Sequence, residues 1–419
     1  MRRLKLAFLL LMVGMSLIAG GLPMQQAHAQ STASKAASDY LNQALDFMQE
    51  NAVHANTLDW KTLRAQALER IQNAQVPADT YPTITWALQQ LGDHHSFFLD
   101  PEAAKRNQQG YNNVFGLNMT DDGTITDIIA GGPADKAGNV RRGDIVQKIN
   151  GIVLKDQQAI NDSLRKNPSS ATLSIQQRDR HRSFDVTLKL GPYESNKRPQ
   201  ARLVKPGIAY IELPAVMGGK MAEEYATIVQ QEIQDLDQNN DIRGWIVDLR
   251  NNNGGNCWPM LAGIGPVVGE GKLGSFFTQG QAVGTWTYSN GKALSGDQVA
   301  AQVQHPYTLR HPLPPVAVLT SPITASSGEA VTIAFRGRPN TRSFGEPTYG
   351  VPTANYAQTL SDGAQIYLTV AIDADRTGKT YDSPISPDQG VHIDWATVYT
   401  QHDQVIKVAA QWLQHQPGR

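Results

Sequence analysis

Ser326 is the residue of this chain whose position best suits nucleophilic chemistry. It follows the apolar run 316–319 and precedes a helical pattern formed by Ala330, Ile333 and Ala334. A serine at a strand-to-helix turn projects its hydroxyl outward, which is the geometry of a serine-hydrolase nucleophile. The alternative is that Ser326 caps the helix, which is a common role of serine.

The predicted helix also offers hydrogen-bond donors beside this hydroxyl. The first N–H groups of a helix have no intrahelical acceptor and point toward negative charge. The backbone N–H of Ser327 is therefore a candidate donor to the oxyanion that forms when a serine attacks a carbonyl group. The side chain of Ser327 is a second candidate for the helix cap.

The elements that must position these residues change in character along the chain. Helical spacing predicts helices over about 37–92, and short alternating runs predict a compact β-rich module over about 113–193. From about residue 206, buried strands alternate with helices, which predicts an α/β core. We expect a signal peptide at 1–29, an N-terminal helical segment at 30–112, the β-rich domain at 113–193 and the α/β core at 194–419.

Two hairpins are predicted within these parts. In the β-rich module, Leu173 and Ile175 face the apolar positions of the run 184–188 across a polar turn at 179–181. In the core, Asn290 followed by Gly291 marks a tight turn between two strands.

Glycine-rich runs recur through the β-rich module and together resemble a bacterial PDZ domain. They are Phe115-Gly116-Leu117-Asn118, Gly-Pro-Ala-Asp-Lys-Ala-Gly at 132–138, Arg-Gly-Asp-Ile-Val at 142–146 and Ile-Asn-Gly at 149–151. The resemblance implies that backbone N–H groups of the 116–118 segment bind a terminal carboxylate while a strand edge pairs with the peptide. The alternative is a structural β-barrel whose glycines only close turns.

Three runs in the core resemble the C-terminal processing (tail-specific) protease family. They are Val-Asp-Leu-Arg-Asn-Asn-Asn-Gly-Gly at 247–255, Thr-Ala-Ser-Ser-Gly-Glu at 324–329 and Phe-Gly-Glu-Pro-Thr-Tyr-Gly at 344–350. In that family the nucleophile stands three residues before the glutamate, which selects Ser326 over Ser327. The resemblance further implies that Gly254 or Gly255 supplies the second oxyanion donor.

The base must differ from that of the best-known branch of the family, because Val351 stands where that branch has its lysine and the next lysine is Lys379. The run Leu-Gly-Asp-His-His-Ser-Phe at 91–97 resembles the histidine segment of tricorn-like members with a Ser-His arrangement. The resemblance assigns the base to His95, with His94 as the alternative. We expect activity to rise near an imidazole pKa, at roughly pH 6 to 7.5.

A third group should orient the histidine, and two acidic residues are candidates. Asp382 precedes a Pro-Ile-Ser-Pro-Asp stretch that is similar to the position of the acidic residue in the tricorn-like relatives, and Glu346 is its competitor. Each also has a structural explanation, Asp382 as a turn residue and Glu346 as a partner for a core arginine. Asp388, within the turn, is expected to be structural.

Metal and cysteine chemistry have little support in the sequence. His94 and His95 are adjacent and lack the spacing that places two ligands on one helix face, so we expect no metal and no cofactor. Cys257 is the single cysteine, so it cannot form an internal disulfide, and we expect it to be a small buried residue that lines the substrate pocket. A cysteine nucleophile is the weaker alternative.

The N-terminus has the pattern of a secretory signal. Three basic residues precede an apolar run at 6–18, and Ala27 and Ala29 stand at the positions that a signal peptidase reads. We expect cleavage after Ala29 and a periplasmic or secreted protein without a stable membrane span, with an uncleaved anchor as the alternative. The net charge of −1 shows no basic surplus, which argues against nucleic-acid partners.

Together these patterns favour an exported serine peptidase that acts on exposed or C-terminal polypeptide segments. The alternative is a catalytically inactive, PDZ-containing peptide-binding or scaffold protein, which the missing lysine at Val351 would explain.

Overall fold

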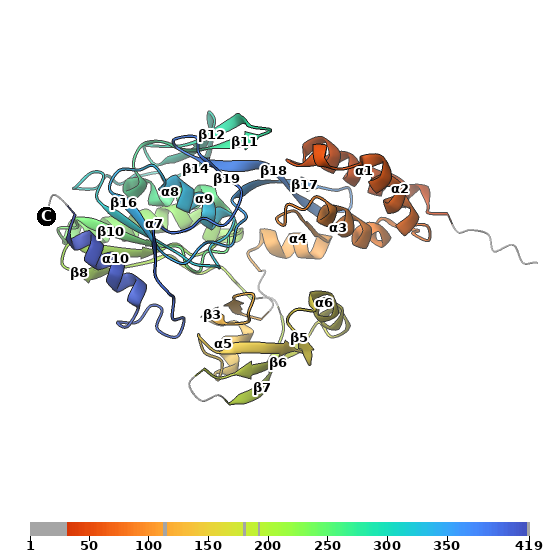
Figure 1. Cartoon of the computed structure of the whole chain (residues 1–419), viewed down its shortest axis with the longest axis horizontal. Helices are drawn as coiled ribbons and strands as arrows, with labels where there is room; N and C mark the ends of the chain where they lie inside the picture. The colour runs from red at the N-terminus through yellow and green to blue at the C-terminus, as the bar shows by residue number, and fades with distance from the viewer. Residues whose placement is uncertain (1–31, 112–114, 179–181, 192, 417–419) are drawn as a thin grey trace, which may run out of the picture.

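The computed structural model describes residues 32–416 except 112–114, 179–181 and 192. It has the α/β architecture that the sequence predicts, with N-terminal helices, a smaller β-rich module and a larger core (Figure 1). The predicted signal peptide at 1–29 lies outside the described residues. Within the described ranges, no helix is long and apolar enough to cross a membrane.

A six-stranded sheet forms the centre of the core. Its order is β20-β16-β15-β10-β9-β8, and every neighbouring pair runs parallel except β8 with β9. The strands are β8 (Gln200–Lys205), β9 (Ile208–Glu212), β10 (Gly244–Asp248), β15 (Val316–Thr320), β16 (Thr341–Gly345) and β20 (Gln389–Gly390). All residues of β9, β10 and β15 are buried, as expected for parallel strands with both faces covered.

Helices cover the two faces of this sheet. The helices α7 (Gly219–Asn239), α8 (Cys257–Val268) and α9 (Ser327–Ala334) pack on one face, and α10 (Gln404–Gln414) packs on the other. Because side chains alternate along a strand, Trp245 contributes to the first interface and Ile246 to the second. The parallel strands β10 and β15 end at the same edge, where the segments 251–255 and 321–326 follow.

An eight-stranded antiparallel sheet extends from the core toward the N-terminal helices. Its main path is β1-β18-β11-β12-β13-β14, and β17 and β19 also pair with β18. The strands are β1 (Phe97–Leu99), β11 (Gly271–Thr278), β12 (Gln281–Ser289), β13 (Lys292–Ser295), β14 (Gln298–Gln302), β17 (Thr353–Thr359), β18 (Gln365–Asp375) and β19 (Thr380–Tyr381). The predicted turn joins β12 to β13, and Asn290 and Gly291 have φ of 45° and 80°.

The predicted N-terminal helices are present, but they do not pack as an isolated cap. They are α1 (Lys35–Asn51), α2 (Trp60–Arg70), α3 (Tyr81–Gln90) and α4 (Pro101–Gln108), with short 3-10 turns at Ala55–Thr57 and Pro77–Thr80. Their apolar core includes Leu360, Ala364, Ile366 and Leu368 from the β17–β18 hairpin. Strand β1 also pairs with β18, so the N-terminal part is joined to a strand near the C-terminus.

The β-rich module lies below the core in Figure 1. It consists of β2 (Leu117–Met119), β3 (Ile125–Ile128), α5 (Pro133–Ala137), β4 (Ile145–Ile149), β5 (Ile152–Val153), α6 (Gln157–Lys166), β6 (Ser170–Gln176) and β7 (Ser183–Lys189). The predicted hairpin is formed by β6 and β7, where Leu173 pairs with Val186 and Ile175 with Phe184. The turn predicted at 179–181 lies outside the described residues.

Candidate active site

Ser326 occupies a strained backbone turn immediately before α9. Its φ of 51° and ψ of −116° lie in a region that residues with a side chain rarely adopt. The Ser326 N–H donates to Glu329 Oε2 at 2.9 Å, so a carboxylate on the new helix holds the turn closed. The Ser326 hydroxyl is therefore directed away from the helix and toward the cleft.

Glu329 is the residue that organises this turn. Its side chain is fully buried, and it accepts hydrogen bonds from the N–H groups of Ser326, Gly350 and Val351 and from the Thr348 hydroxyl. Burial raises the pKa of Glu329, against the lowering effect of these hydrogen bonds. Glu329 thus connects the Ser326 turn to the loop that contains Val351.

The imidazole of His95 lies against the Ser326 hydroxyl. The distance from His95 Nε2 to Ser326 Oγ is 2.9 Å, although the residues are 231 positions apart. The other ring nitrogen, Nδ1, lies 2.7 Å from Thr353 Oγ1 on β17. If Nε2 accepts the Ser326 proton, Nδ1 must carry its own proton and donate to Thr353.

A local turn and a strand pairing hold His95 in this position. Asp93 Oδ1 accepts from the N–H groups of His95 and Ser96 at 2.9 and 2.7 Å. Asn355 Nδ2 donates to the His95 carbonyl at 2.9 Å, and Thr369 N donates to Ser96 Oγ at 3.0 Å. Strands β17 and β18 therefore fix the loop that carries the histidine.

The environment of His95 favours the neutral imidazole. Burial lowers the pKa of His95 to about 4, and the nearby Asp93 carboxylate opposes this only in part. His95 is consequently uncharged near neutral pH, which is the form that can accept a proton. The rise in activity at pH 6 to 7.5, expected from a carboxylate partner, does not follow from this arrangement.

The third group differs from the two acidic residues expected from the sequence. Asp382 is exposed, whereas Glu346 Oε1 accepts from Ile393 N and lies 2.9 Å from His392 Nδ1. In the described part of the chain, the hydroxyl of Thr353 holds the position at Nδ1 expected for either acid. The expectation relied on chain order, and neither acid reaches the imidazole in space.

Other residues considered beside the site have structural roles. His94 is exposed, has φ of 56° and lines the same cleft as His95. Asp388 accepts from Arg336 Nη1 at 2.7 Å and from Ser343 N at 2.7 Å, which agrees with the structural role expected for it. Lys379 is exposed and lies over the Tyr381 ring, with Nζ 5.2 Å from the ring centroid.

The glycine loop at 251–255 passes directly beside the nucleophile turn. Gly254 has φ of 116°, and a Cβ at this position would lie 3.0 Å from Ser326 Cβ. At Gly255 a Cβ would lie 2.1 Å from the Val216 carbonyl oxygen, so glycine is required there too. Ser327 Oγ donates to the Gly255 carbonyl at 2.6 Å, which ties the loop to α9.

The N–H groups near Ser326 are not equivalent. The N–H of Gly254 donates to Asn252 Oδ1 at 3.1 Å, so it is already engaged. The N–H of Ser327 belongs to the first residue of α9, where no carbonyl one turn earlier is available within the helix. Of the donors expected from the sequence, Ser327 and Gly255 remain the stronger candidates.

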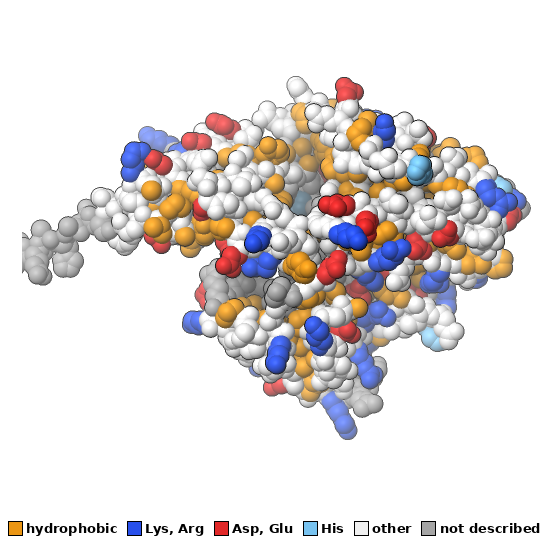
Figure 2. Space-filling view, turned by 180° about the vertical axis from the view of Figure 1, so that it is seen from behind, with side chains coloured by type: hydrophobic (Ala, Val, Ile, Leu, Met, Phe, Trp, Pro, Cys, Tyr) orange, Lys and Arg blue, Asp and Glu red, His pale blue; other side chains and the backbone are white. Residues whose placement is uncertain are grey.

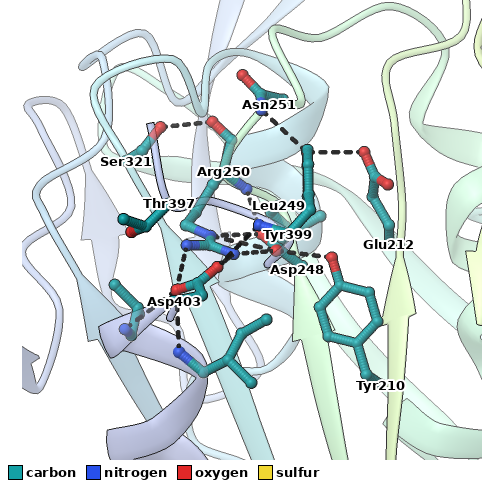
Figure 3. A network of polar contacts seen from close by, with 12 residues as sticks. Tyr210, Glu212, Asp248, Leu249, Arg250, Asn251, Ser321, Thr397, Tyr399 and Asp403 are labelled. Atoms are coloured by element: carbon teal, nitrogen blue, oxygen red, sulfur yellow. Dashed lines mark hydrogen bonds and ion pairs between the residues drawn. The ribbon is translucent and has the colours of Figure 1, made fainter. Parts of the chain in front are cut away.

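A buried polar network lies behind the glycine loop (Figure 3). The Arg250 side chain is fully buried and donates to Asp248 and Asp403 at 2.6 and 2.8 Å. Asn251 donates to Tyr399 Oη at 2.9 Å, and Tyr399 donates to Glu212 at 2.8 Å. Because buried charges need partners, this pairing fixes the start of the loop. Asp248, Arg250 and Asn251 belong to the run 247–255, but no sequence motif indicates their partners, which are Asp403, Tyr399 and Glu212.

The network continues into the β-rich module. Lys197 Nζ lies 2.7 Å from Glu212 Oε1 and 3.2 Å from Asp127 Oδ2 on β3. Arg142 also approaches Asp127, at 3.6 Å. Charged contacts therefore join the module to the core beside the site.

Ser326 and His95 line a cleft of about 1710 Å³ between the core, the N-terminal helices and the β-rich module. From behind, the surface is hollowed between the N-terminal helices and the core (Figure 2). Leu117 and Asn118 of the expected carboxylate-binding run line the same cleft. The other two residues of that run are packed internally, because Phe115 contacts the module core and a Cβ on Gly116 would lie 2.9 Å from Gly132 Cα.

Cys257 lines the cleft at the first position of α8. Burial raises the pKa of its thiol to about 12, so it stays protonated and is a poor nucleophile. Among the described residues, no group of three or more His, Cys, Asp or Glu side chains could hold a metal ion.

Two family models match the chain. Residues 207–391 match peptidase family S41, and residues 124–177 match the PDZ domain. The first match covers the strands, the glycine loop and the Ser326 turn, and the second covers most of the β-rich module.

Individual proteins show the same relationship. The nisin-resistance protein of Lactococcus lactis subsp. lactis is 30% identical over 201 residues, which cover 46% of this chain and 61% of that protein. The chain thus spans less than two thirds of that relative. The chloroplastic C-terminal processing peptidase of Tetradesmus obliquus is 25% identical over 366 residues, or 80% of this chain and 73% of the relative.

A solved structure gives the same fold. The photosystem II D1 C-terminal processing protease superposes with a TM-score of 0.59 at 21% identity, covering 86% of this chain and 94% of that one. At this identity the likeness shows the fold alone. With both family models matched, the chain contains a peptidase family S41 region at 207–391 and a PDZ domain at 124–177, and it is similar to proteins named C-terminal processing peptidases.

Proposed function

We propose that this chain is an exported serine peptidase that cleaves exposed or C-terminal polypeptide segments through an acyl-enzyme on Ser326, with His95 as the base. The observation that carries this proposal is the 2.9 Å contact between Ser326 Oγ and His95 Nε2, in a cleft that PDZ residues share. Similarity to proteins named C-terminal processing peptidases supports the reaction.

In the first half of the reaction, His95 Nε2 takes the proton of the Ser326 hydroxyl while Oγ attacks the peptide carbonyl carbon. The imidazolium then gives that proton to the leaving amine, and the acyl group stays on Ser326. In the second half, His95 Nε2 takes a proton from a water molecule whose oxygen attacks the acyl carbon. The imidazolium then gives that proton to Ser326 Oγ as the ester C–Oγ bond breaks, and the acid product leaves. Thr353 accepts from Nδ1–H throughout and keeps the ring in the required tautomer.

The oxyanion would be bound by backbone N–H groups. Ser327 supplies the first donor at the start of α9, and Gly255 supplies the second from the glycine loop. These donors are positioned before the substrate arrives, because Ser327 Oγ already bonds the Gly255 carbonyl.

The PDZ domain would deliver the substrate to this cleft. In this proposal, the segment around Leu117 and Asn118, which lines the cleft, binds a terminal carboxylate through backbone N–H groups while an adjacent strand edge pairs with the peptide. The signal pattern at 1–29, with cleavage expected after Ala29, supports an activity in the periplasm or outside the cell.

Labelling with a fluorophosphonate probe tests the proposal, because the probe reacts with an activated serine. The wild-type protein should be labelled, and Ser326→Ala should not. His95→Ala should lose nearly as much labelling as Ser326→Ala. The double variant should be labelled as weakly as either single variant, since the two residues act as a unit.

Two control variants make the test specific. Lys379→Ala removes the next lysine after Ser326, which is exposed, and should label normally. If Lys379→Ala abolished labelling while His95→Ala kept it, a serine–lysine pair would replace the proposed one. His94→Ala should also label normally, and an unlabelled wild-type protein would favour the peptide-binding scaffold.

A further inference from the structure

Asp373 is a buried acid in the cleft that the proposed reaction does not use. It lies on β18, its side chain is 2% exposed, and its Oδ1 has no hydrogen-bond partner. A carboxyl oxygen left without a partner in a buried site costs free energy. Such a group requires either a structural or a functional explanation.

The residues around Asp373 in the cleft are largely apolar. Phe276 is its register partner on β11, so the two side chains lie next to each other on one face of the sheet. Trp258 meets the Phe276 ring edge-on, with centroids 6.5 Å apart. Cys257 and Ala330 line the same region from α8 and α9.

The position relative to Ser326 identifies which part of a substrate would enter. His95 must protonate the leaving amine, so the leaving peptide lies on the side of His95, Thr353 and β17. The acyl part remains on Ser326 beside the Ser327 N–H. Ile372 is the register partner of Thr353, and side chains alternate along β18, so Asp373 faces the opposite side of the sheet, where a side chain of the acyl part can enter.

We propose that Asp373 forms the floor of the pocket for the residue on the acyl side of the cleaved bond, and that this pocket selects lysine or arginine. The aliphatic stem of either side chain would pack against Phe276 and Trp258, and its cationic end would give Asp373 Oδ1 the missing partner. Uncharged apolar residues would fill the pocket and leave the acid unpaired.

The electrostatics of the empty pocket agree with this selection. Burial, and secondarily the neighbouring Glu329 carboxylate, raises the pKa of Asp373 well above its usual range. The raised pKa favours the protonated acid, and an entering cation would stabilise the carboxylate and displace that proton to solvent. The inference deepens the proposed function and rests on it.

The test uses peptides that differ only in the residue before the cleaved bond, with lysine, arginine, glutamine or norleucine there. The wild-type protein should cleave the two basic peptides with a kcat/KM at least about 10-fold higher than that for the norleucine peptide. Asp373→Asn should lower kcat/KM for the two basic peptides by about 100-fold, because a desolvated charge pair is lost. For the norleucine peptide, kcat/KM should change by less than about 3-fold. Asp375→Asn, on the same strand but bonded to Thr377 and Tyr381, is the matched control and should keep the preference.

Each failure has a separate meaning. If the wild-type protein labels with fluorophosphonate but prefers norleucine or glutamine, the assignment of Asp373 is wrong and the proposed function stands. If it neither labels nor cleaves any peptide, the proposed function itself fails. Should Asp373→Asn not fold, the sites cut by the wild-type protein in a denatured protein substrate decide, and cleavage unrelated to basic residues overturns the inference.

Discussion

At the scale of single residues, the most consequential contact is the one between His95 and a hydroxyl. Thr353 Oγ1 lies 2.7 Å from Nδ1, where serine peptidases often have a carboxylate. A neutral acceptor fixes the tautomer but does not stabilise the imidazolium by charge. The base is therefore weaker than in a charged triad, and it stays deprotonated to lower pH.

Substitution of Thr353 measures the value of this contact. Thr353→Val keeps the shape but leaves the buried Nδ1–H without an acceptor, which costs about 1 to 3 kcal/mol. We expect kcat to fall roughly 10- to 100-fold, with little change in KM. Thr353→Ser keeps the hydroxyl and should retain most of the activity, so equal losses in both variants would contradict the positioning role.

The pH profile follows from the buried imidazole. Burial lowers the pKa of His95 to about 4, so His95 is neutral from neutral pH down into the acidic range. We expect kcat/KM to stay level between about pH 5.5 and 7.5 and to fall only as the pH approaches the lowered pKa. The unfolded chain takes up this proton near pH 6.5, so the free energy of unfolding declines as the pH falls from there toward 4.

A variant gives the profile an internal control. Thr353→Asp would place a carboxylate at Nδ1 and raise the pKa of His95, so the acidic fall in kcat/KM should move up by a unit or more. If the wild-type protein already loses activity near pH 6.5, burial does not control this histidine.

At the scale of elements, the start of α9 depends on an acid that does not face the substrate. Glu329 accepts from the N–H groups of Ser326 and Val351 through Oε2. Glu329→Gln would turn an amide donor toward those N–H groups, and we expect unfolding free energy to fall by about 2 to 4 kcal/mol. Fluorophosphonate labelling should slow as well, because the Ser326 N–H loses the carboxylate that accepts its hydrogen bond.

The neighbouring Glu346 provides the comparison. It lies at the end of β16, is less buried and accepts from Ile393 N. Glu346→Gln should unfold in urea at nearly the wild-type concentration and label normally. If both substitutions lowered stability and labelling equally, the loss would come from removing any acid in this region and not from the hydrogen bonds that Glu329 accepts at the Ser326 turn.

The sequence predicted the elements better than it predicted their contacts. Ser326 and the glycine loop stand directly after β15 and β10, so local patterns were enough to place them. Thr353 belongs to no motif, and its role depends on where β17 starts and how it pairs with β18. Asp382 was chosen by its order in the chain, which does not determine its distance from the imidazole.

Packing between distant segments was likewise outside the reach of local patterns. The helices over 37–92 were predicted, but their shared core with the β17–β18 hairpin could not be. The ion pair between Arg250 and Asp403 joins residues 153 positions apart, and periodicity contains no information about such pairs.

At the scale of the whole molecule, PDZ residues and the Ser326–His95 pair line one cleft. Leu117 and Asn118 line it together with Ser326, and Lys197 joins Asp127 of the PDZ domain to Glu212 of the core. In the proposed function, a chain end bound by the PDZ domain therefore lies in the same cleft as Ser326. The terminal carboxylate should be a main determinant of binding.

Peptides with free and amidated C-termini test this expectation on the full-length Ser326→Ala variant. Loss of a charge-assisted contact to backbone N–H groups should weaken binding by about 1.5 to 3 kcal/mol, which calorimetry can measure. Equal affinities would show that the segment around Leu117 and Asn118 does not bind the terminus. A peptide with one added residue and a free carboxylate controls for length.

The attachment of His95 to the β17–β18 hairpin has a consequence for the timing of synthesis. A ribosome releases Ser326 before it releases Thr353, Asn355 and Thr369, the residues that hold the histidine and its loop. A chain that is still growing, or one truncated before β17, contains the nucleophile but has no positioned base. In the proposed mechanism, a chain therefore becomes able to cleave peptides only after the β17–β18 hairpin has been synthesised and has packed against the N-terminal helices and β1.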